Sequence, residues 1–290
     1  MARVILSFIM FLIFVGHSHA TELNIGLIPE QNVFKQFKRY EPLGKYIEQK
    51  TGIKIKFTIL SRYGNIMESF HKKKMDGAFW GSFTGAMAIK KHGIQPVARP
   101  VNLDGSSTYR GYIMVRKDSG IKNISDMKGK SVAFVEKATT AGYIFPIAYF
   151  KENGIKDIET YFSVYYFTGS HDAAINALLN KKVDIACAKN TVYEILARED
   201  PGIKDKLVII AKSADVPSNG LGLRKELAYG VKAELKQALL DMHVDPEGKK
   251  VLEKFGVKRF IETGKNDYSS VFDITERAGI DLKNYEYVNK

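Results

Sequence analysis

The sequence predicts an α/β protein made of two similar α/β lobes that two crossovers connect. Three observations support this fold class. β-Rich runs alternate with segments of helical spacing, which is typical of α/β layers around a sheet. One long segment is repeated once, and a chain of 290 residues is long enough for two lobes.

The first twenty residues have the features of a signal peptide. Arg3 supplies a positive charge, and the apolar run at 4–15 is shorter than the roughly 20 residues that span a bilayer. Ser18-His19-Ala20 is a small-x-small cleavage site. We therefore expect residues 1–20 to be removed and the chain to be exported to the periplasm; a retained anchor is the alternative.

The elements of the first half follow from periodicity and from their end signals. Residues 23–28 are β-rich, and residues 53–60 alternate as a strand does. Residues 40–52 have helical spacing and end in a glycine, so we predict a helix there. The other predicted elements of this half are a helix at 65–73, a strand at 77–80 and a helix at 84–92.

A second copy of this pattern lies further along the chain. With Tyr63 set against His171, residues 63–85 align without gaps with residues 171–193. Asp76 then falls on Asp184, and a β-rich segment precedes each copy. Chance likeness between units that share turn chemistry is the alternative explanation. The repeat predicts two similar lobes that face each other.

The repeat also suggests where the lobes begin and end. We expect residues 21–112 to form the first part of lobe 1 and residues 113–213 to form lobe 2. Residues 214–290 should return to lobe 1 with the C-terminal helices. The crossovers are expected near residues 109–117 and 211–227.

Charge and cysteine content limit the possible partners. The formal net charge is +12, but the lysines are spread along the chain and export argues against a nucleic-acid partner. A basic surface also favours the capture of small anions. Cys187 is the single cysteine, which excludes an internal disulfide, and its predicted buried strand favours a core role. We expect a monomer.

Hydroxyl side chains stand at several predicted junctions between a strand and the next helix. Thr139-Thr140-Ala141 follows the predicted strand at 132–135, and Ser170-His171 opens a predicted helix. Helix N-termini carry unpaired N–H groups and partial positive charge, so they suit anions. Each hydroxyl could instead be an ordinary N-cap. Ser82 and Thr84 mark a further junction of this kind.

Three larger side chains are also candidates for the site. Tyr63 and His171 occupy equivalent points of the repeat, so we expect them to face one gap. His171 at a helix N-terminus is expected to be neutral and to act as a donor. Trp80, the single tryptophan, follows a strand end, and we expect it to line a cleft rather than the core.

No pattern in the chain indicates catalysis. The HExxH, GxSxG, GxxxxGK[ST] and CxxC motifs are absent, and the histidines after residue 20 lie far apart. We therefore expect no enzyme activity, no cofactor and no metal site.

Several segments in fixed order resemble the periplasmic phosphonate/phosphite/phosphate-binding proteins of ABC importers. They are "YEPLGKYIEQKTG", "KKKMDGAFWG", "YRGYIMVRKDSGI", "NISDMKGKSVAFVEKATTAGY", "GSHDAAINALLNKKVDIA" and "VPSNGLGLRKEL". The resemblance spans nearly the whole chain after residue 20. It implies the fold of type II periplasmic binding proteins, in which two α/β lobes joined by two hinge strands close on the ligand.

The resemblance also implies a set of ligand-binding residues. Thr139, Thr140 and Ala141 occupy the hydroxyl-rich turn that grips phosphonate oxygens in that family. His171 matches the histidine of the family's "GSH" segment, which also contains Ser170. The other matching positions are Tyr63 and Trp80 in the first lobe, Tyr109 at the hinge and Asn219 in "VPSNG".

Some of these positions depart from the family pattern. Ala141 replaces a residue that is often serine, and Tyr143 stands where histidine is common. Aminoalkylphosphonate binders hold the ligand ammonium with carboxylates. Here the segment after Cys187 reads "AKNTVYE", and Asn219 stands where an acid would serve that purpose. The departures favour phosphate, phosphite or methylphosphonate over an aminoalkyl ligand.

The function implied by the resemblance is capture of a small phosphorus oxyanion and its delivery to an ABC permease. Presentation of the same ligand to a membrane sensor kinase is the alternative.

Overall fold

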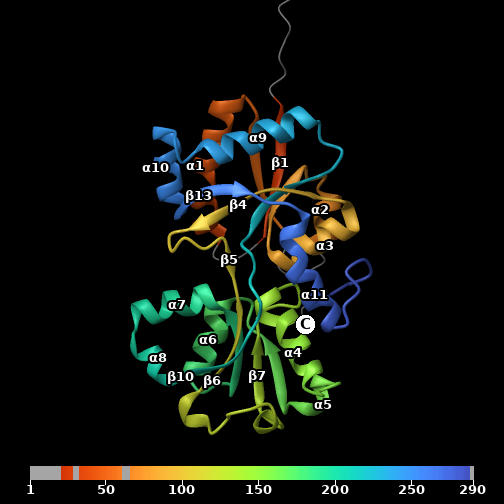
Figure 1. The fold of residues 1–290 in the computed structure, drawn as a ribbon, viewed down its shortest axis with the longest axis vertical. Helices are drawn as coiled ribbons and strands as arrows, with labels where there is room; N and C mark the ends of the chain where they lie inside the picture. Colours follow the sequence, from red (N-terminus) through yellow and green to blue (C-terminus); the bar gives the residue numbers. More distant parts are fainter. Residues whose placement is uncertain (1–20, 29–32, 61–65, 288–290) are drawn as a thin grey trace, which may run out of the picture.

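The computed structural model describes residues 21–28, 33–60 and 66–287, and in it the chain forms two α/β lobes, each built on its own sheet (Figure 1). The first sheet has the order β13–β4–β12–β3–β1–β2. Its strands are β1 (Glu22–Leu27), β2 (Lys54–Ile59), β3 (Gly77–Trp80), β4 (Gln95–Asn102), β12 (Gly220–Leu223) and β13 (Val257–Glu262). Strand β1 is parallel to β2 and β3, whereas β12 and β13 run antiparallel to their neighbours. The sheet is therefore mixed, although the alternation of strands and helices predicted a mostly parallel one.

The second sheet repeats this arrangement. It has the order β10–β6–β9–β7–β8. Its strands are β6 (Gly111–Arg116), β7 (Ser131–Phe134), β8 (Val164–Phe167), β9 (Ile185–Lys189) and β10 (Leu207–Lys212). Strand β7 is parallel to β8 and β9, and β6 is antiparallel to β9 and β10. When the strand order is read from β2 in the first sheet and from β8 in the second, the first five strands have the same connectivity and relative directions. The sequence repeat predicts this similarity.

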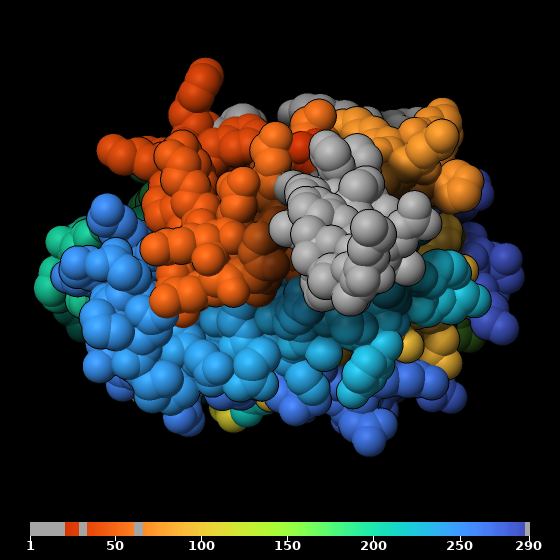
Figure 2. All heavy atoms as spheres, turned by 90° about the horizontal axis from the view of Figure 1, so that it is seen from above, coloured from red at the N-terminus to blue at the C-terminus, as the bar shows by residue number. Residues whose placement is uncertain are grey.

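Helices cover the faces of both sheets. Those of the first lobe are α1 (Val33–Thr51), α2 (Ile66–Lys72), α3 (Ser82–His92), α9 (Tyr229–Asp241) and α10 (Pro246–Phe255). Those of the second lobe are α4 (Phe145–Glu152), α5 (Ile158–Tyr161), α6 (His171–Leu179), α7 (Asn190–Glu199) and α8 (Gly202–Lys206). Figure 2 shows the N-terminal segment in red and orange beside the blue C-terminal helices, and α1 contacts both α9 and α10.

Helix α1 begins earlier than the predicted start at residue 40. Its first turns are tied to the sheet because the buried Gln36 side chain donates from Nε2 to the Ile28 carbonyl, at 2.7 Å. Pro42 lies inside the helix and does not end it.

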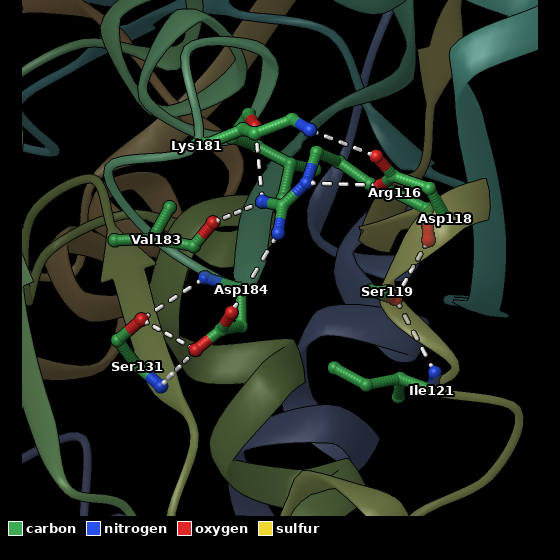
Figure 3. Close-up of polar contacts among 9 residues, drawn as sticks. Arg116, Asp118, Ser119, Ile121, Ser131, Lys181, Val183 and Asp184 are labelled. Atoms are coloured by element: carbon green, nitrogen blue, oxygen red, sulfur yellow. Dashed lines mark hydrogen bonds and ion pairs between the residues drawn. The ribbon is translucent and has the colours of Figure 1, made fainter.

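Each lobe has an Asp–Arg ion pair at an equivalent position. In the second lobe, Asp184 Oδ2 accepts from the Ser131 backbone N–H at 3.0 Å, and Arg116 Nη2 lies 3.7 Å from Asp184 Oδ1 (Figure 3). In the first lobe, Arg224 Nη2 lies 2.9 Å from Asp76 Oδ1. Asp76 and Asp184 are the residues that the sequence alignment pairs, so the repeat extends to side-chain contacts.

Two short strands connect the lobes. Strands β5 (Thr108–Tyr109) and β11 (Val216–Pro217) pair antiparallel in a ladder of their own. Only Tyr109 of the first predicted crossover lies in this ladder, because Gly111 already begins β6 of the second sheet. We propose that the lobes meet at this ladder, close to the boundaries predicted after residues 112 and 213.

The C-terminal segment packs against both lobes. Helix α11 (Ser269–Arg277) contacts α3 of the first lobe and α4 of the second. In the second lobe, Lys151 Nζ donates to the Ala278 carbonyl at 2.6 Å, and the Tyr285 hydroxyl donates to the Lys137 carbonyl at 3.1 Å. Lys91 Nζ of α3 donates to the Tyr285 carbonyl at 2.8 Å. The last described residues therefore contact both lobes.

None of the helices within the described ranges is long and apolar enough to cross a membrane.

Candidate functional site

A cavity of about 80 Å³ lies between the lobes, where several helices begin. A single water needs roughly 10–15 Å³ by this kind of measure, so the cavity has room for a small polyatomic ion. Eight of the predicted site residues are described by the structure, and seven of these line the cavity: Tyr109, Thr139, Thr140, Ala141, Ser170, His171 and Asn219. Lobe 1 adds the start of α3, with Ser82, Phe83 and Thr84.

The predicted hydroxyl-rich turn forms one wall of the cavity. Thr139 is extended, and a turn of π-helix, Thr140–Ile144, follows it and leads into α4. The first N–H groups of such a helix have no acceptor within the helix, so those of Thr140 and Ala141 can bind an anion. Gly142 fits here because a Cβ would stand 2.5 Å from the Val135 Cβ.

The hydroxyl of Thr139 has another partner in the structure. Thr139 Oγ1 donates to the Glu136 carbonyl at 2.6 Å, and the Thr139 N–H donates to the same oxygen at 3.0 Å. The hydroxyl hydrogen is thus used inside the turn, although the sequence suggested that it holds the anion.

Three buried hydroxyls link the two lobes and the hinge. Ser82 Oγ lies 2.6 Å from Thr140 Oγ1 and 2.5 Å from the Tyr109 hydroxyl. Ser82 is 1% exposed and Thr140 is 2% exposed. Ser82 of the first lobe is thus bonded both to Thr140 of the second lobe and to Tyr109 of the hinge. An anion bound at these hydroxyls would contact both lobes at once.

His171 opens α6 and lines the cavity, as predicted. Its Nδ1 accepts the backbone N–H of Lys189 at 3.2 Å. Burial and the nearby Lys189 ammonium lower the pKa of His171 to about 3, while Asp172 acts weakly in the other direction. The ring is therefore neutral at pH 7 with its hydrogen on Nε2, which makes Nε2 a donor.

Lys189 is a cavity residue that the sequence did not single out. It ends β9, and its Nζ lies 4.1 Å from the centroid of the Tyr109 ring. It is the single lysine or arginine among the described residues that line the cavity. The repeat could have pointed to it, because the alignment pairs Lys189 with Gly81, and these two residues are the N-caps of α7 and α3. An anion in the cavity would be attracted by this charge.

Trp80 does not line the cavity, and that expectation was wrong. Trp80 is 1% exposed, its indole Nε1 donates to the Gly222 carbonyl at 3.2 Å, and its ring packs against Phe70. A tryptophan on a strand between two other strands is buried by the helices that cover the sheet, and its N–H needs an internal acceptor. Tyr63 lies outside the described residues.

Two other predicted residues have structural partners. Ser170 is the N-cap of α6, with its hydroxyl accepting from the Ala173 N–H at 3.4 Å. Burial raises the pKa of the Cys187 thiol, so that it stays protonated in the core. Within the described part of the chain, no group of three metal-ligating side chains comes together.

The neutral state of His171 predicts a pH-dependent stability. Its pKa is about 3 in the folded protein and about 6.5 when the chain is unfolded. Between these values only the unfolded chain binds the proton, so the free energy of unfolding falls as the pH falls from 7 to 4 and is flat above 7. We expect His171→Asn, whose Oδ1 can still accept the Lys189 N–H, to lose part of this dependence.

Urea unfolding of both proteins at pH 7 and at pH 4.5 tests this expectation. The drop in stability should be smaller in His171→Asn, with other histidines contributing equally to both proteins. An equal drop in both would show that His171 is protonated in the folded state.

Comparisons with known proteins agree with this architecture. Residues 25–268 match the family model described as "ABC transporter, phosphonate, periplasmic substrate-binding protein". The chain is 28% identical over 248 residues to the phosphonates-binding periplasmic protein of Escherichia coli, covering 82% of this chain and 72% of that protein.

Solved structures share the fold. A binding protein component of a Pseudomonas aeruginosa ABC phosphonate transporter matches with a TM-score of 0.75 and 24% identity, over 90% of this chain and 88% of that one. PhnD1 of Prochlorococcus marinus, solved with methylphosphonate, matches with a TM-score of 0.74 and 20% identity, over 90% of this chain and 99% of that one.

The family consists of periplasmic binding components of transporters and not of enzymes, which favours transport over ligand presentation to a sensor kinase. Because the family model covers most of the chain, the assignment does not depend on any single motif. The chain belongs to the family of periplasmic substrate-binding proteins of phosphonate ABC transporters.

Proposed function

We propose that the protein captures a small phosphorus oxyanion between its lobes, with methylphosphonate as the first candidate, and delivers it to a membrane permease. One observation carries the proposal: helix N-termini and hydroxyls from both lobes surround a cavity of about 80 Å³. The protein would act as a monomer. An anion that touches both lobes would stabilise the closed state relative to the open one. Export through a cleaved segment at residues 1–20 belongs to this proposal.

The bound oxygens would be held by donors of several kinds. The N–H groups of Thr140 and Ala141 and the hydroxyls of Thr140 and Ser82 face the cavity from opposite lobes. His171 supplies Nε2–H, and Lys189 supplies the positive charge. Hydrogen bonds to an ionised acceptor are about twice as strong as neutral ones, so a few donors suffice for a compact anion.

Glu136 gives a reason to expect discrimination between anions. It lines the same cavity and is buried. A carboxylate at the wall disfavours an anion without a proton to share, and sulfate carries none at neutral pH. Phosphonates, phosphite and phosphate can each present a P–OH group. We therefore expect these anions to bind and sulfate to bind weakly or not at all.

A calorimetric and thermal-shift screen of the exported protein tests the proposed function. The probes are methylphosphonate, phosphate, phosphite and sulfate. A ligand at 100 times its Kd adds about 2.7 kcal/mol of stability, which raises the Tm by about 5 °C or more. A screen in which none of the phosphorus anions shifts the Tm would contradict the proposal. So would release of phosphate from a phosphonate over many turnovers, because a binding protein leaves its ligand unchanged.

A further inference from the structure

The chain after α11 is held to the rest of the protein by buried side chains. Leu282 and Tyr287 are both buried, and the Tyr287 hydroxyl accepts the backbone N–H of Ile66 at 3.3 Å. Terminal residues are usually poorly ordered unless such contacts hold them. Figure 1 shows α11 and the blue segment that follows it between the two lobes, and α11 contacts both α3 and α4. This C-terminal segment therefore has a defined place between the lobes.

Tyr285 in this segment contacts both lobes. Its hydroxyl donates to the Lys137 carbonyl of lobe 2 at 3.1 Å. Its own carbonyl accepts from Lys91 Nζ of α3, in lobe 1, at 2.8 Å. Its ring packs edge-on against Phe83 of the same helix, with 5.4 Å between the ring centroids. One residue thus joins α3 of lobe 1 to lobe 2 by three contacts.

The partners of Tyr285 belong to two walls of the cavity. Phe83 lines the cavity from α3, and Lys137 stands in the turn whose residues Glu136 and Thr139 line it from lobe 2. The Glu136 carbonyl accepts the N–H and the hydroxyl of Thr139, and the next carbonyl of the turn accepts from Tyr285. Burial raises the pKa of Tyr285, so its hydroxyl keeps its hydrogen at neutral pH and can donate. Tyr285 therefore fixes this turn from outside the cavity.

We propose that Tyr285 is a positioning residue for ligand binding, which holds α3 and the turn of lobe 2 in the arrangement that binds the anion. A movement that separates α3 from this turn has to break at least one of the contacts of Tyr285. The apparent Kd of a ligand is its intrinsic Kd divided by the fraction of protein in the binding arrangement, so Tyr285 raises affinity without touching the ligand. This inference rests on the proposed function for its ligand, but the arrangement of the lobes can be measured without ligand.

Tyr285→Phe tests this role, because phenylalanine keeps the ring against Phe83 and removes only the hydroxyl that reaches lobe 2. Calorimetry and stopped-flow kinetics with methylphosphonate measure the effect. Loss of one neutral hydrogen bond should raise the Kd by about 3- to 10-fold, mostly through faster dissociation. Tyr161→Phe is the matched control, because the Tyr161 hydroxyl donates to the Ile124 carbonyl at 2.8 Å within lobe 2 and away from the cavity. It should leave the Kd unchanged.

Distances between the lobes distinguish positioning from a general loss of stability. Spin labels at Lys72→Cys of α2 and Thr160→Cys of α5 report on the two lobes, because both positions are exposed and Cys187 is buried. Without ligand, Tyr285→Phe should add longer distances to the wild-type distribution, and Tyr161→Phe should not. A hydroxyl with a merely structural role would lower the Tm and leave the distances unchanged.

The outcomes separate the role of Tyr285 from the proposed function. If methylphosphonate does not bind wild-type protein, the proposed function is wrong, and the role of Tyr285 in binding is wrong with it. If methylphosphonate binds wild-type protein and Tyr285→Phe with the same Kd, only the role of Tyr285 is wrong. That role is also overturned if Tyr285→Phe leaves the label distances unchanged, or if Tyr161→Phe loses as much affinity as Tyr285→Phe.

Discussion

Replacing Thr140 with valine is expected to weaken methylphosphonate binding by well over tenfold. Valine keeps the shape of the side chain but removes the hydroxyl, which lies 2.6 Å from Ser82 Oγ of the opposite lobe. A hydrogen bond to a charged group contributes about 1.5–3 kcal/mol, which corresponds to roughly 10- to 150-fold in Kd. Calorimetric titration of the variant measures the loss directly.

Thr139→Val is the matched control for this prediction. The two threonines are adjacent, but the Thr139 hydroxyl already donates to the Glu136 carbonyl at 2.6 Å. We expect its loss to cost stability more than affinity, with a lower Tm and a Kd within about threefold of the wild-type value. Equal losses of affinity in both variants would contradict the assignment of Thr140 as the binding hydroxyl.

A double-mutant cycle with Ser82→Ala shows whether the two hydroxyls act together. If one anion bonds to both, the losses of Ser82→Ala and Thr140→Val should not add, because the first change already disrupts the shared contact. Simple additivity would indicate that only one of the two residues touches the ligand.

The repeat is the reason why the fold could be predicted from sequence. The β1–β2–β3 and β7–β8–β9 units have the same order and direction, and the alignment pairs Asp76 with Asp184. The sequence pattern did not predict strand β4. It contains Pro96 and Pro100, which argue against a strand with neighbours on both sides. The register of its pairing with β12 shifts between Ala98 and Pro96, and no local pattern reveals such a shift.

The candidate site was predictable in part, and the reason differs between its residues. The turn at Thr139–Ala141 and His171 could be found because hydroxyls and a histidine follow predicted strands directly. Trp80 was misplaced because burial depends on which helices cover the sheet. Lys189 was overlooked because a lysine at a strand end is normally solvated. Its place in the cavity depends on its contact with Tyr109 of β5, which is distant in sequence.

Replacing Lys189 with glutamine is expected to weaken methylphosphonate binding by at least 30-fold. Lys189 is partly buried, its Nζ lies 4.1 Å from the centre of the Tyr109 ring, and it lines the cavity with His171. Removing one partner of a buried charge pair costs about 2–5 kcal/mol, of which the lower value is about 30-fold in Kd. Calorimetry at pH 7 measures this change, and a wild-type Kd in the variant would contradict the role of Lys189.

The structure offers a matched lysine that separates local from general charge effects. Lys212 Nζ lies 5.6 Å from the centre of the Tyr112 ring, in the same lobe but outside the cavity. Lys212→Gln removes the same charge and should leave the Kd nearly unchanged, because solvent and salt screen an exposed charge beyond about 8–10 Å. If both variants lost affinity equally, the attraction would come from the net charge of +12 rather than from a cation at the ligand. Raising the salt concentration then distinguishes the two explanations further, since the general field is screened and a direct contact largely is not.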